Sequence, residues 1–290
     1  MKLTTFQHAG DIKIGGVIDG ERIIPLTEVA PDMNSLIAQG SAGLEHAQSI
    51  IDKSNESIPL EEVRLLAPIP RPIRNIMCLG KNYAAHALEA HRAWGDAAEL
   101  PEFPLIFTKS VMAVTGPFDE IPYNPDISTA IDYESELVVV IGQPGINISR
   151  AAAMEHVYGY TIMNDLTARD LQRRHKQFFK GKSLDGHAPM GPWIVTADEI
   201  PDPHNLNVSS AVNGAEKQND NTKQMMFDIP EIIAQLSLGM ALWPGDLIST
   251  GTPEGVGFAR TPPEFLKPGD VITCTVEGIG SIRNRISSSR

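Results

Sequence analysis

The sequence predicts an α+β fold that is mainly β, with a small N-terminal domain followed by one larger domain. Short apolar segments rich in β-branched residues outnumber helical patterns, and the two do not alternate as βαβ units would. A turn signal at Asp19-Gly20 separates a pair of such segments, and Asn213-Gly214 is a second hairpin turn signal. The proline-rich stretch 67–74 predicts a stiff connection, which places the boundary between domains at residues 1–67 and 68–290.

The expected elements follow from these patterns in chain order. Residues 12–17 and 22–26 should form a hairpin, and residues 34–52 a helical region. Further strands are expected at residues 75–79, 105–108, 134–141, 158–163, 193–196, 206–212, 246–249 and 271–276. Further helices are expected at residues 83–93, 150–156, 166–174 and 229–240.

The composition narrows the class of protein. A net charge of −12 argues against a nucleic-acid partner, which requires a basic surface. The N-terminal residues lack the apolar core of a signal peptide, and no apolar segment approaches membrane-spanning length. Cys78 and Cys274 each lie in an apolar stretch, so we expect two buried thiols in a reducing compartment. A cytoplasmic enzyme without a membrane partner is the resulting expectation.

Two acids open the most apolar predicted strand, within Asp132-Tyr133-Glu134-Ser135-Glu136-Leu137. Because side chains alternate along a strand, Glu134 and Glu136 point to the same face. Two adjacent carboxylates at a buried strand end repel each other, and a divalent cation would compensate them. The alternative is a frayed strand end at which both carboxylates are solvated.

A third acid, Asp165, follows the predicted strand 158–163 directly before a helical pattern. Asp at such a junction is often only a helix N-cap. Three carboxylates without a neighbouring His or Cys would instead favour a hard cation, Mg²⁺ or Mn²⁺, over zinc.

His86 and Glu89 lie three positions apart in a predicted helix, so a carboxylate can orient the imidazole. Near a metal, such a pair could take a proton from water. The alternative is a surface pair, with Glu89 serving Arg92. The stretch 90–104 combines polar residues, Trp94 and prolines, and is typical of a mobile cover that selects substrates.

Two glycine-containing segments invite a ligand. Gly181-Lys182-Ser183 resembles part of a phosphate-binding loop, but Lys176 occupies the position of the required upstream glycine, so that interpretation fails. Residues 250–257 form a glycine-rich loop after a predicted strand, either as a simple tight turn or as a close approach to a ligand through Thr252.

Together these segments resemble the fumarylacetoacetate hydrolase family. The shared pattern runs from Lys81-Asn82-Tyr83 through the Glu134 and Asp165 segments to the loop 250–257, and the likeness covers roughly residues 73–286. Animal fumarylacetoacetate hydrolases carry a further metal-ligating Asp where this sequence has Leu79 and Gly80. This departure points away from fumarylacetoacetate and toward the shorter acylpyruvate and oxaloacetate branch.

The resemblance implies a mixed β-roll, a homodimer, and a Mg²⁺ or Mn²⁺ ion held by Glu134, Glu136 and Asp165. It also implies that His86 and Glu89 activate water and that Gln172 and Lys182 hold an oxyanion. Substrate binding would fall to Tyr83, Lys109, Arg169 and Thr252.

The expected reaction is hydrolysis of the carbon–carbon bond of an acylpyruvate or related 2,4-diketo acid. His86, backed by Glu89, would deprotonate water, and Lys182 with Gln172 would stabilise the developing charge. The runner-up is an oxaloacetate decarboxylase, which needs no water, and isomerases or hydrolases of related 2-oxo acids are also compatible. A catalytically silent metal- or carboxylate-binding protein is the non-enzyme alternative.

Overall fold

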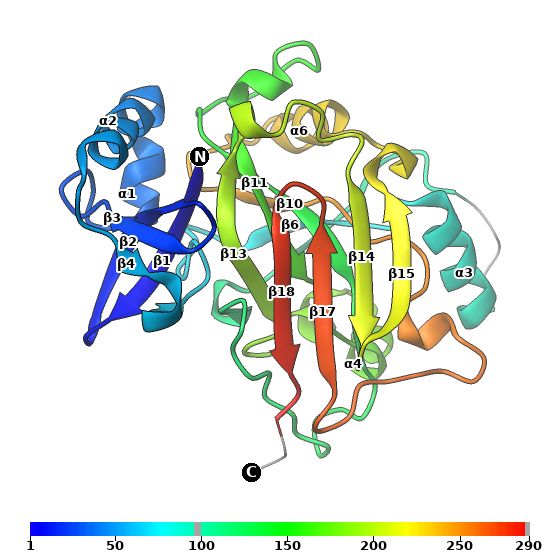
Figure 1. The fold of residues 1–290 in the computed structure, drawn as a ribbon. Helices are drawn as coiled ribbons and strands as arrows, with labels where there is room; N and C mark the ends of the chain where they lie inside the picture. Colours follow the sequence, from blue (N-terminus) through cyan, green and yellow to red (C-terminus); the bar gives the residue numbers. More distant parts are fainter. Residues whose placement is uncertain (96–99, 288–290) are drawn as a thin grey trace.

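The computed structural model describes residues 1–95 and 100–287, and three β-sheets form its framework (Figure 1). The strands of the twelve-stranded sheet are β1 (Lys2–His8), β2 (Asp11–Ile18), β3 (Arg22–Pro25), β4 (Ile58–Pro59), β5 (Arg64–Leu65), β6 (Ile76–Gly80), β7 (Leu105–Lys109), β8 (Val114–Thr115), β10 (Ser135–Ile141), β11 (Val157–Asn164), β13 (Ala188–Thr196) and β16 (Leu247–Ser249). The four-stranded sheet contains β14 (Asn207–Val212), β15 (Ala215–Asn221), β17 (Val271–Val276) and β18 (Gly280–Arg285). A two-stranded sheet pairs β9 (Ile131–Asp132) with β12 (Thr167–Ala168).

Helices are short and lie around the sheets. The α-helices are α1 (Met33–Ala38), α2 (Gly40–Lys53), α3 (Ala84–Trp94), α4 (Arg169–His175), α5 (Phe179–Lys182) and α6 (Ile229–Ser237). The 3₁₀ turns are η1 (Leu60–Glu62), η2 (Val111–Ala113), η3 (Ala153–His156), η4 (Ala197–Glu199), η5 (Thr222–Gln224) and η6 (Gly257–Ala259). None of the described helices combines the length and apolar character needed to cross a bilayer.

The centre of the molecule is β10, which is buried on both faces. In the main path of the large sheet the order is β4-β3-β2-β1-β13-β11-β10-β16-β6-β7. Leu137 and Val139 face a core shared with Val208 and Ile272 of the four-stranded sheet. The alternate residues of β10, with Val138 among them, face a second core that includes side chains of α1 and α2. This sandwich of a mixed sheet and an antiparallel sheet confirms the predicted mainly-β, mixed-roll class.

The N-terminal unit joins the large sheet directly (Figure 1). β1 pairs antiparallel with β13, with Lys2 opposite Val195. The hairpin at Asp19-Gly20 forms as predicted between β2 and β3, and Asp19 takes a positive φ of 54°. The sheet therefore runs through both predicted domains, and the boundary at residue 67 stays a prediction.

Several local expectations were wrong in detail. The helix expected at 166–174 begins only at Arg169, because residues 167–168 pair with β9. Residues 150–156 form a 3₁₀ turn over Ala153–His156 alone. The helical region at 34–52 is two helices that meet at Gln39. β1, β15 and β18 were not predicted, because polar residues interrupt their apolar pattern.

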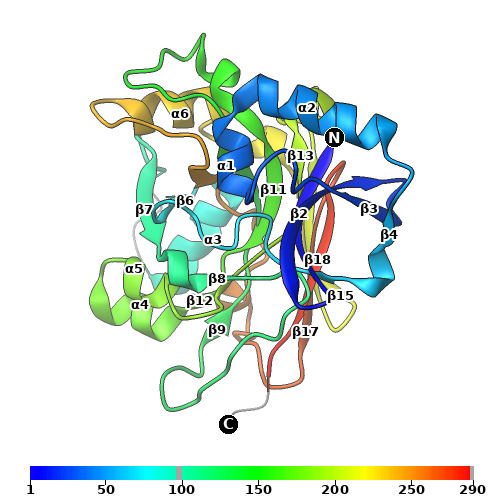
Figure 2. The ribbon, with the colours of Figure 1, turned by 90° about the vertical axis from the view of Figure 1, so that its left-hand side faces the viewer.

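One end of the large sheet carries the helices that bear the predicted site residues. Figure 2 shows α3, α4 and α5 gathered beside β6 and β7. Cys78 on β6 and Cys274 on β17 are both buried and free, as expected from their apolar surroundings.

Candidate active site

Three buried carboxylates meet where β10 begins and β11 ends. Glu134 precedes β10, Glu136 lies within it, and Asp165 follows β11. The strands pair antiparallel with Ser135 opposite Asn164, and this register brings the acids together. One carboxylate oxygen of each residue lies within 4.8 Å of the others, and the residues are at most 4% exposed. The strand end is therefore not solvated.

Asp165 is also not a helix cap. The N-terminal cap position of α4 is Ala168, and the carboxylate of Asp165 instead receives buried lysines. The interpretation of Asp165 as a simple N-cap is thereby excluded.

The pKa values of Glu134 and Glu136 are shifted in opposite directions because their neighbours differ. Burial raises the pKa of Glu136 well above its usual range, and Asp165 and Glu134 raise it further. Burial would also raise the pKa of Glu134, but Lys182 and Arg169 outweigh it and lower that pKa to about 2. The positive charges of Lys182 and Arg169 thus stabilise the Glu134 carboxylate, whereas Glu136 is repelled by the neighbouring carboxylates of Asp165 and Glu134.

Two lysine side chains reach the cluster. Lys182 Nζ lies 2.5 Å from Glu134 Oε2 and 2.6 Å from Asp165 Oδ2. Lys109 Nζ lies 2.7 Å from Asp165 Oδ1, as an ion pair, and donates a hydrogen bond to the carbonyl of Leu166 at 3.1 Å. Burial opposes the charge of Lys182, but Asp165 and Glu134 prevail and raise its pKa, so it remains an ammonium at neutral pH.

The donor set fits a hard divalent cation. All three clustered residues offer carboxylate oxygens, the ligands that Mg²⁺ and Mn²⁺ prefer. The ammonium of Lys182 makes cationic contacts to two of the acids, which indicates that this position favours positive charge. Glu136 accepts hydrogen bonds from Ser249 Oγ at 2.5 Å and from Gly251 N at 3.0 Å, which fix its carboxylate.

His86 and Glu89 form the predicted pair on α3. Glu89 Oε1 lies 2.9 Å from His86 Nδ1, and the two carboxylate oxygens lie 3.1 and 3.0 Å from Gly255 N. A hydrogen bond from Nδ1–H to the carboxylate leaves Nε2 as the basic nitrogen. Gly255 has a φ of +103°, and a Cβ there would lie 2.1 Å from the carbonyl oxygen of Lys217. Glu89 therefore serves His86 and the glycine loop rather than Arg92.

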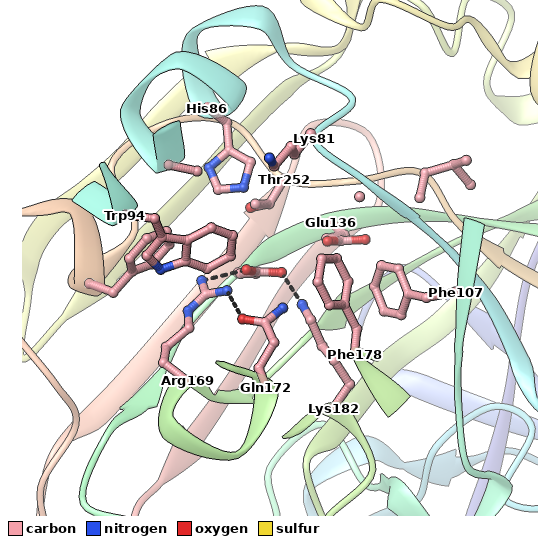
Figure 3. Close-up of a pocket in the computed structure, with 15 residues that line it drawn as sticks. Lys81, His86, Trp94, Phe107, Glu136, Arg169, Gln172, Phe178, Lys182 and Thr252 are labelled. Atoms are coloured by element: carbon pink, nitrogen blue, oxygen red, sulfur yellow. Dashed lines mark hydrogen bonds and ion pairs between the residues drawn. The ribbon is translucent and has the colours of Figure 1, made fainter. Parts of the chain in front are cut away.

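The pocket lies between α3 and the carboxylates (Figure 3). His86 lies on the opposite side of the pocket from Gln172 and Lys182, and all three line it. Ala90 and Trp94 of the predicted cover also line it, whereas residues 96–99 of that stretch lie outside the described residues. The structure thus brings His86, Gln172 and Lys182 together, and their catalytic roles stay predictions.

Arg169 lines the pocket and holds neighbouring polar side chains in place. Its guanidinium donates to Asp132 Oδ2 at 2.9 Å, to Glu134 Oε1 at 2.5 Å and to Gln172 Oε1 at 3.2 Å. It also lies over the ring of Phe258, 4.2 Å from the centroid. Because its carboxylate contacts are already made, Arg169 orients Gln172 so that the amide nitrogen remains as the donor.

Thr252 lines the pocket, but its hydroxyl is already bonded. Thr252 Oγ1 donates to the carbonyl of Ser135 at 3.0 Å and accepts from Gln218 Nε2 at 2.8 Å. Neither Tyr83 nor Lys109 is among the described residues that line the pocket. Tyr83 forms an isolated bridge with Met225, and Lys109 is fully buried behind Asp165. Their predicted contact with substrate therefore has no support in this geometry.

Several pocket residues were not found from the sequence. Phe107, Phe178 and Phe258 supply aromatic walls, and Lys81 lies with its Nζ 5.7 Å from the ring centroid of Trp94. Such aromatic residues carry no signal that separates a pocket wall from an ordinary core. Asp132 was visible beside Glu134, but its contacts with Gly257 N (2.7 Å) and Arg169 require the folded chain.

Comparisons with known proteins agree with this geometry. Residues 75–287 match the family model described as fumarylacetoacetate (FAA) hydrolase C-terminal. The chain is 44% identical to oxaloacetate tautomerase YisK of Bacillus subtilis (strain 168), over 99% of this chain and 100% of that protein. It is 41% identical to the mitochondrial oxaloacetate tautomerase fahd2 of Xenopus laevis, over 99% of this chain and 90% of the relative.

Solved structures give the same result. A fumarylacetoacetate hydrolase from psychrophilic Exiguobacterium antarcticum aligns with a TM-score of 0.84 and 39% identity, covering 100% of both chains. A maleylpyruvate hydrolase from Sphingobium sp. SYK-6, solved with manganese(II) and pyruvate, aligns with a TM-score of 0.81 and 30% identity, also over 100% of both chains. The chain therefore belongs to the fumarylacetoacetate hydrolase family, whose relatives described above are named as tautomerases and hydrolases.

Proposed function

We propose that this protein is a divalent-cation-dependent enzyme that interconverts the keto and enol forms of oxaloacetate. The observation that carries this proposal is the 44% identity with an oxaloacetate tautomerase over 99% of this chain. The similarity thus extends over the N-terminal unit as well as the catalytic region. The Xenopus laevis relative, also named an oxaloacetate tautomerase, covers the same share of the chain.

The site supplies the groups that this reaction needs. Mg²⁺ or Mn²⁺, held by Glu134, Glu136 and Asp165, would polarise the 2-oxo group and so acidify the neighbouring C–H bond. Tautomerisation then requires a base beside carbon 3 and hydrogen-bond donors beside the 2-oxygen. His86 lies on one side of the pocket, and Gln172 and Lys182 lie on the other.

In this proposal His86 moves the proton. Its Nε2 removes a proton from carbon 3, while the hydrogen bond to Glu89 stabilises the imidazolium. Lys182 and Gln172 donate hydrogen bonds to the 2-oxygen as it gains negative charge. The imidazolium then returns the proton to that oxygen. One proton leaves carbon and one reaches oxygen, so no water is consumed and no carbon–carbon bond breaks.

Hydrolysis of an acylpyruvate is the second candidate. It is favoured by the structural likeness to a maleylpyruvate hydrolase solved with manganese(II) and pyruvate. The same His86–Glu89 pair would take its proton from water instead of carbon. Oxaloacetate decarboxylation remains the third reaction to test, because it draws on the same polarised 2-oxo group. We also propose that the protein is a homodimer and that it is cytoplasmic.

A substrate screen tests these candidates directly. Freshly dissolved enol-oxaloacetate is supplied with Mg²⁺ or Mn²⁺, and formation of the keto form is followed with a keto-specific malate dehydrogenase and NADH. Carbon dioxide release and acylpyruvate cleavage are measured in parallel. We expect tautomerisation to be the fastest reaction. Keto formation no faster than in a chelated sample, together with rapid acylpyruvate cleavage, would replace the tautomerase proposal by the hydrolase.

Two variants complete the screen. Glu136→Ala is expected to be inactive, because it removes one of the three clustered carboxylates. Glu155→Gln changes an exposed carboxylate in η3, at a position that does not line the pocket, and should match the wild type.

A further inference from the structure

Gln218 connects the four-stranded sheet to the candidate active site. It lies on β15, is 1% exposed, and does not line the pocket itself. Its Nε2 donates to Thr252 Oγ1 and to the carbonyl of Pro253, both at 2.8 Å. Its Oε1 accepts from Ser135 N at 3.0 Å and from Ser210 Oγ at 2.9 Å. Both amide protons and both oxygen lone pairs are thus used, so the orientation of the amide is fixed.

Two hydrogen bonds of this group hold the backbone of Ser135, the residue between Glu134 and Glu136. Ser135 stands between Glu134 and Glu136, and its N–H is the donor to Gln218. Its carbonyl accepts the hydroxyl of Thr252 at 3.0 Å. Gln218, Ser135 and Thr252 therefore form a closed ring of three hydrogen bonds. Ser210 on β14 ties this ring to the neighbouring strand.

The ring determines which way the hydroxyl of Thr252 points. A hydroxyl has one proton and two lone pairs. In Thr252 the proton goes to Ser135, and Gln218 occupies one lone pair. Without Gln218 the hydroxyl could rotate, and the loop would lose the bond at Pro253 that holds its backbone. The atoms that Thr252 presents to the pocket thus depend on Gln218, a residue of the four-stranded sheet.

The acids themselves depend less on Gln218. The Glu136 carboxylate is held by Ser249 and Gly251, and the Glu134 carboxylate by Arg169 and Lys182. Loss of the Gln218 amide would therefore disturb the wall at Thr252 more than the positions of the carboxylates.

We infer that Gln218 is a positioning residue for substrate binding, which acts by fixing the loop at Thr252 as a wall of the pocket that takes the 2-oxo acid. This inference rests on the proposed function only in taking a 2-oxo acid as the ligand. Two consequences can be measured separately. Affinity for the acid should depend on the Gln218 amide, whereas affinity for the metal should not.

The test uses Gln218→Met, which keeps the length of the side chain and removes its four hydrogen bonds. Calorimetry measures Mn²⁺ binding to the chelated and dialysed protein, and then oxalate binding to the Mn²⁺-loaded protein. Displacement of the pocket wall at Thr252 should weaken oxalate binding by about tenfold, the scale of one hydrogen bond. Mn²⁺ affinity should stay within about threefold. With oxaloacetate, KM should rise by about the same factor as the oxalate dissociation constant, with a smaller change in kcat.

Asn284→Leu is the matched control. Asn284 is also a 1% exposed amide, and its Nδ2 donates to the carbonyls of Gly116 and Asp119, away from the pocket. Its loss should destabilise the protein without changing either affinity. Equal oxalate affinities in Gln218→Met and Asn284→Leu, or equal losses of oxalate and Mn²⁺ affinity in Gln218→Met, would overturn the inference.

Thr252→Val provides the second measurement. If Gln218 acts through Thr252, adding Gln218→Met to Thr252→Val should weaken oxalate binding by no more than a further factor of about two. Fully additive losses would refute that route. If Gln218→Met does not fold, Thr252→Val alone tests the inference. An oxalate affinity equal to that of the wild type in Thr252→Val would then refute it. Oxalate binding requires no turnover, so a wild type inactive on oxaloacetate would reject the proposed reaction and leave this result standing.

Discussion

Replacing Glu89 by Gln tests the role of the His86–Glu89 pair. The wild-type carboxylate accepts from His86 Nδ1 and from Gly255 N with both of its oxygens. Gln keeps the size of the side chain but has one acceptor oxygen and no charge. The imidazolium that forms when His86 takes a proton would therefore lose its charged partner.

The expected magnitude follows from the change in hydrogen bonding. A hydrogen bond to a charged group contributes about 1.5–3 kcal/mol, and a neutral one about 0.5–1.5 kcal/mol. The difference of about 1–1.5 kcal/mol applies in the transition state, where the imidazolium develops, and corresponds to a rate loss of about tenfold. Because Glu89 is not one of the clustered acids, Mn²⁺ affinity should not change.

The assay compares kcat and KM for enol-oxaloacetate at one saturating Mg²⁺ concentration, with acylpyruvate cleavage and oxaloacetate decarboxylation measured alongside. We expect kcat for proton transfer to fall about tenfold and decarboxylation to fall less, since decarboxylation needs no base. Glu89→Asp, which keeps the charge but shortens the reach, separates loss of charge from loss of position. A Glu89→Gln enzyme with wild-type kcat would remove the pair from the mechanism. Equal losses in all three reactions would assign the pair to a step that they share.

Three further predictions concern charge and assembly. In protein treated with a chelator, burial raises the pKa of Glu136, and the charges of Asp165 and Glu134 raise it further. The folded state therefore disfavours the charged form of Glu136. Its contribution to the free energy of unfolding falls as the pH rises above about 4.3, the usual pKa of a Glu side chain. Glu136→Gln should thus melt above the wild type at pH 7 in EDTA and not at acid pH; a lower melting temperature at pH 7 contradicts this. Arg169→Met leaves two buried carboxylates short of a partner and should lower the urea-measured free energy of unfolding by about 3–5 kcal/mol, against under about 1 kcal/mol for the exposed Arg150→Met. Light scattering should give twice the chain mass of 31.5 kDa, and a dilution-independent monomer would refute the dimer.

Local patterns were enough to predict the parts of the site that adjacent residues build. Side-chain alternation placed Glu134 and Glu136 on one face, and helical spacing placed Glu89 beside His86. For Asp165 the local pattern left a helix N-cap open, and the family resemblance added it to the predicted metal ligands. The inferences from alternation and from helical spacing each need only one element to fold as expected.

The remaining site residues depend on contacts between distant segments. Gln218 on β15 reaches Thr252 in the loop after β16, and nothing in the polar sequence of β15 distinguishes it from a solvent-facing residue. Lys109 was expected to contact substrate, but full burial places it behind Asp165 instead. The helix start at Arg169 was missed because the pairing of Thr167 with Asp132 overrides the helical pattern. Tertiary pairing, rather than local propensity, decided these positions.

The pairing of β1 with β13 has a consequence for how the chain reaches its native state. Lys2 pairs with Val195, so β1, which can pair early with the adjacent β2, gains its second partner only after almost two hundred further residues have been made. Such distant pairing is slow because the intervening loop must close first. Expression of residues 68–290 alone would leave the β1 side of β13, including the buried Ile194, without its neighbour. That exposed edge would favour aggregation, so the N-terminal strand β1 protects this edge of β13.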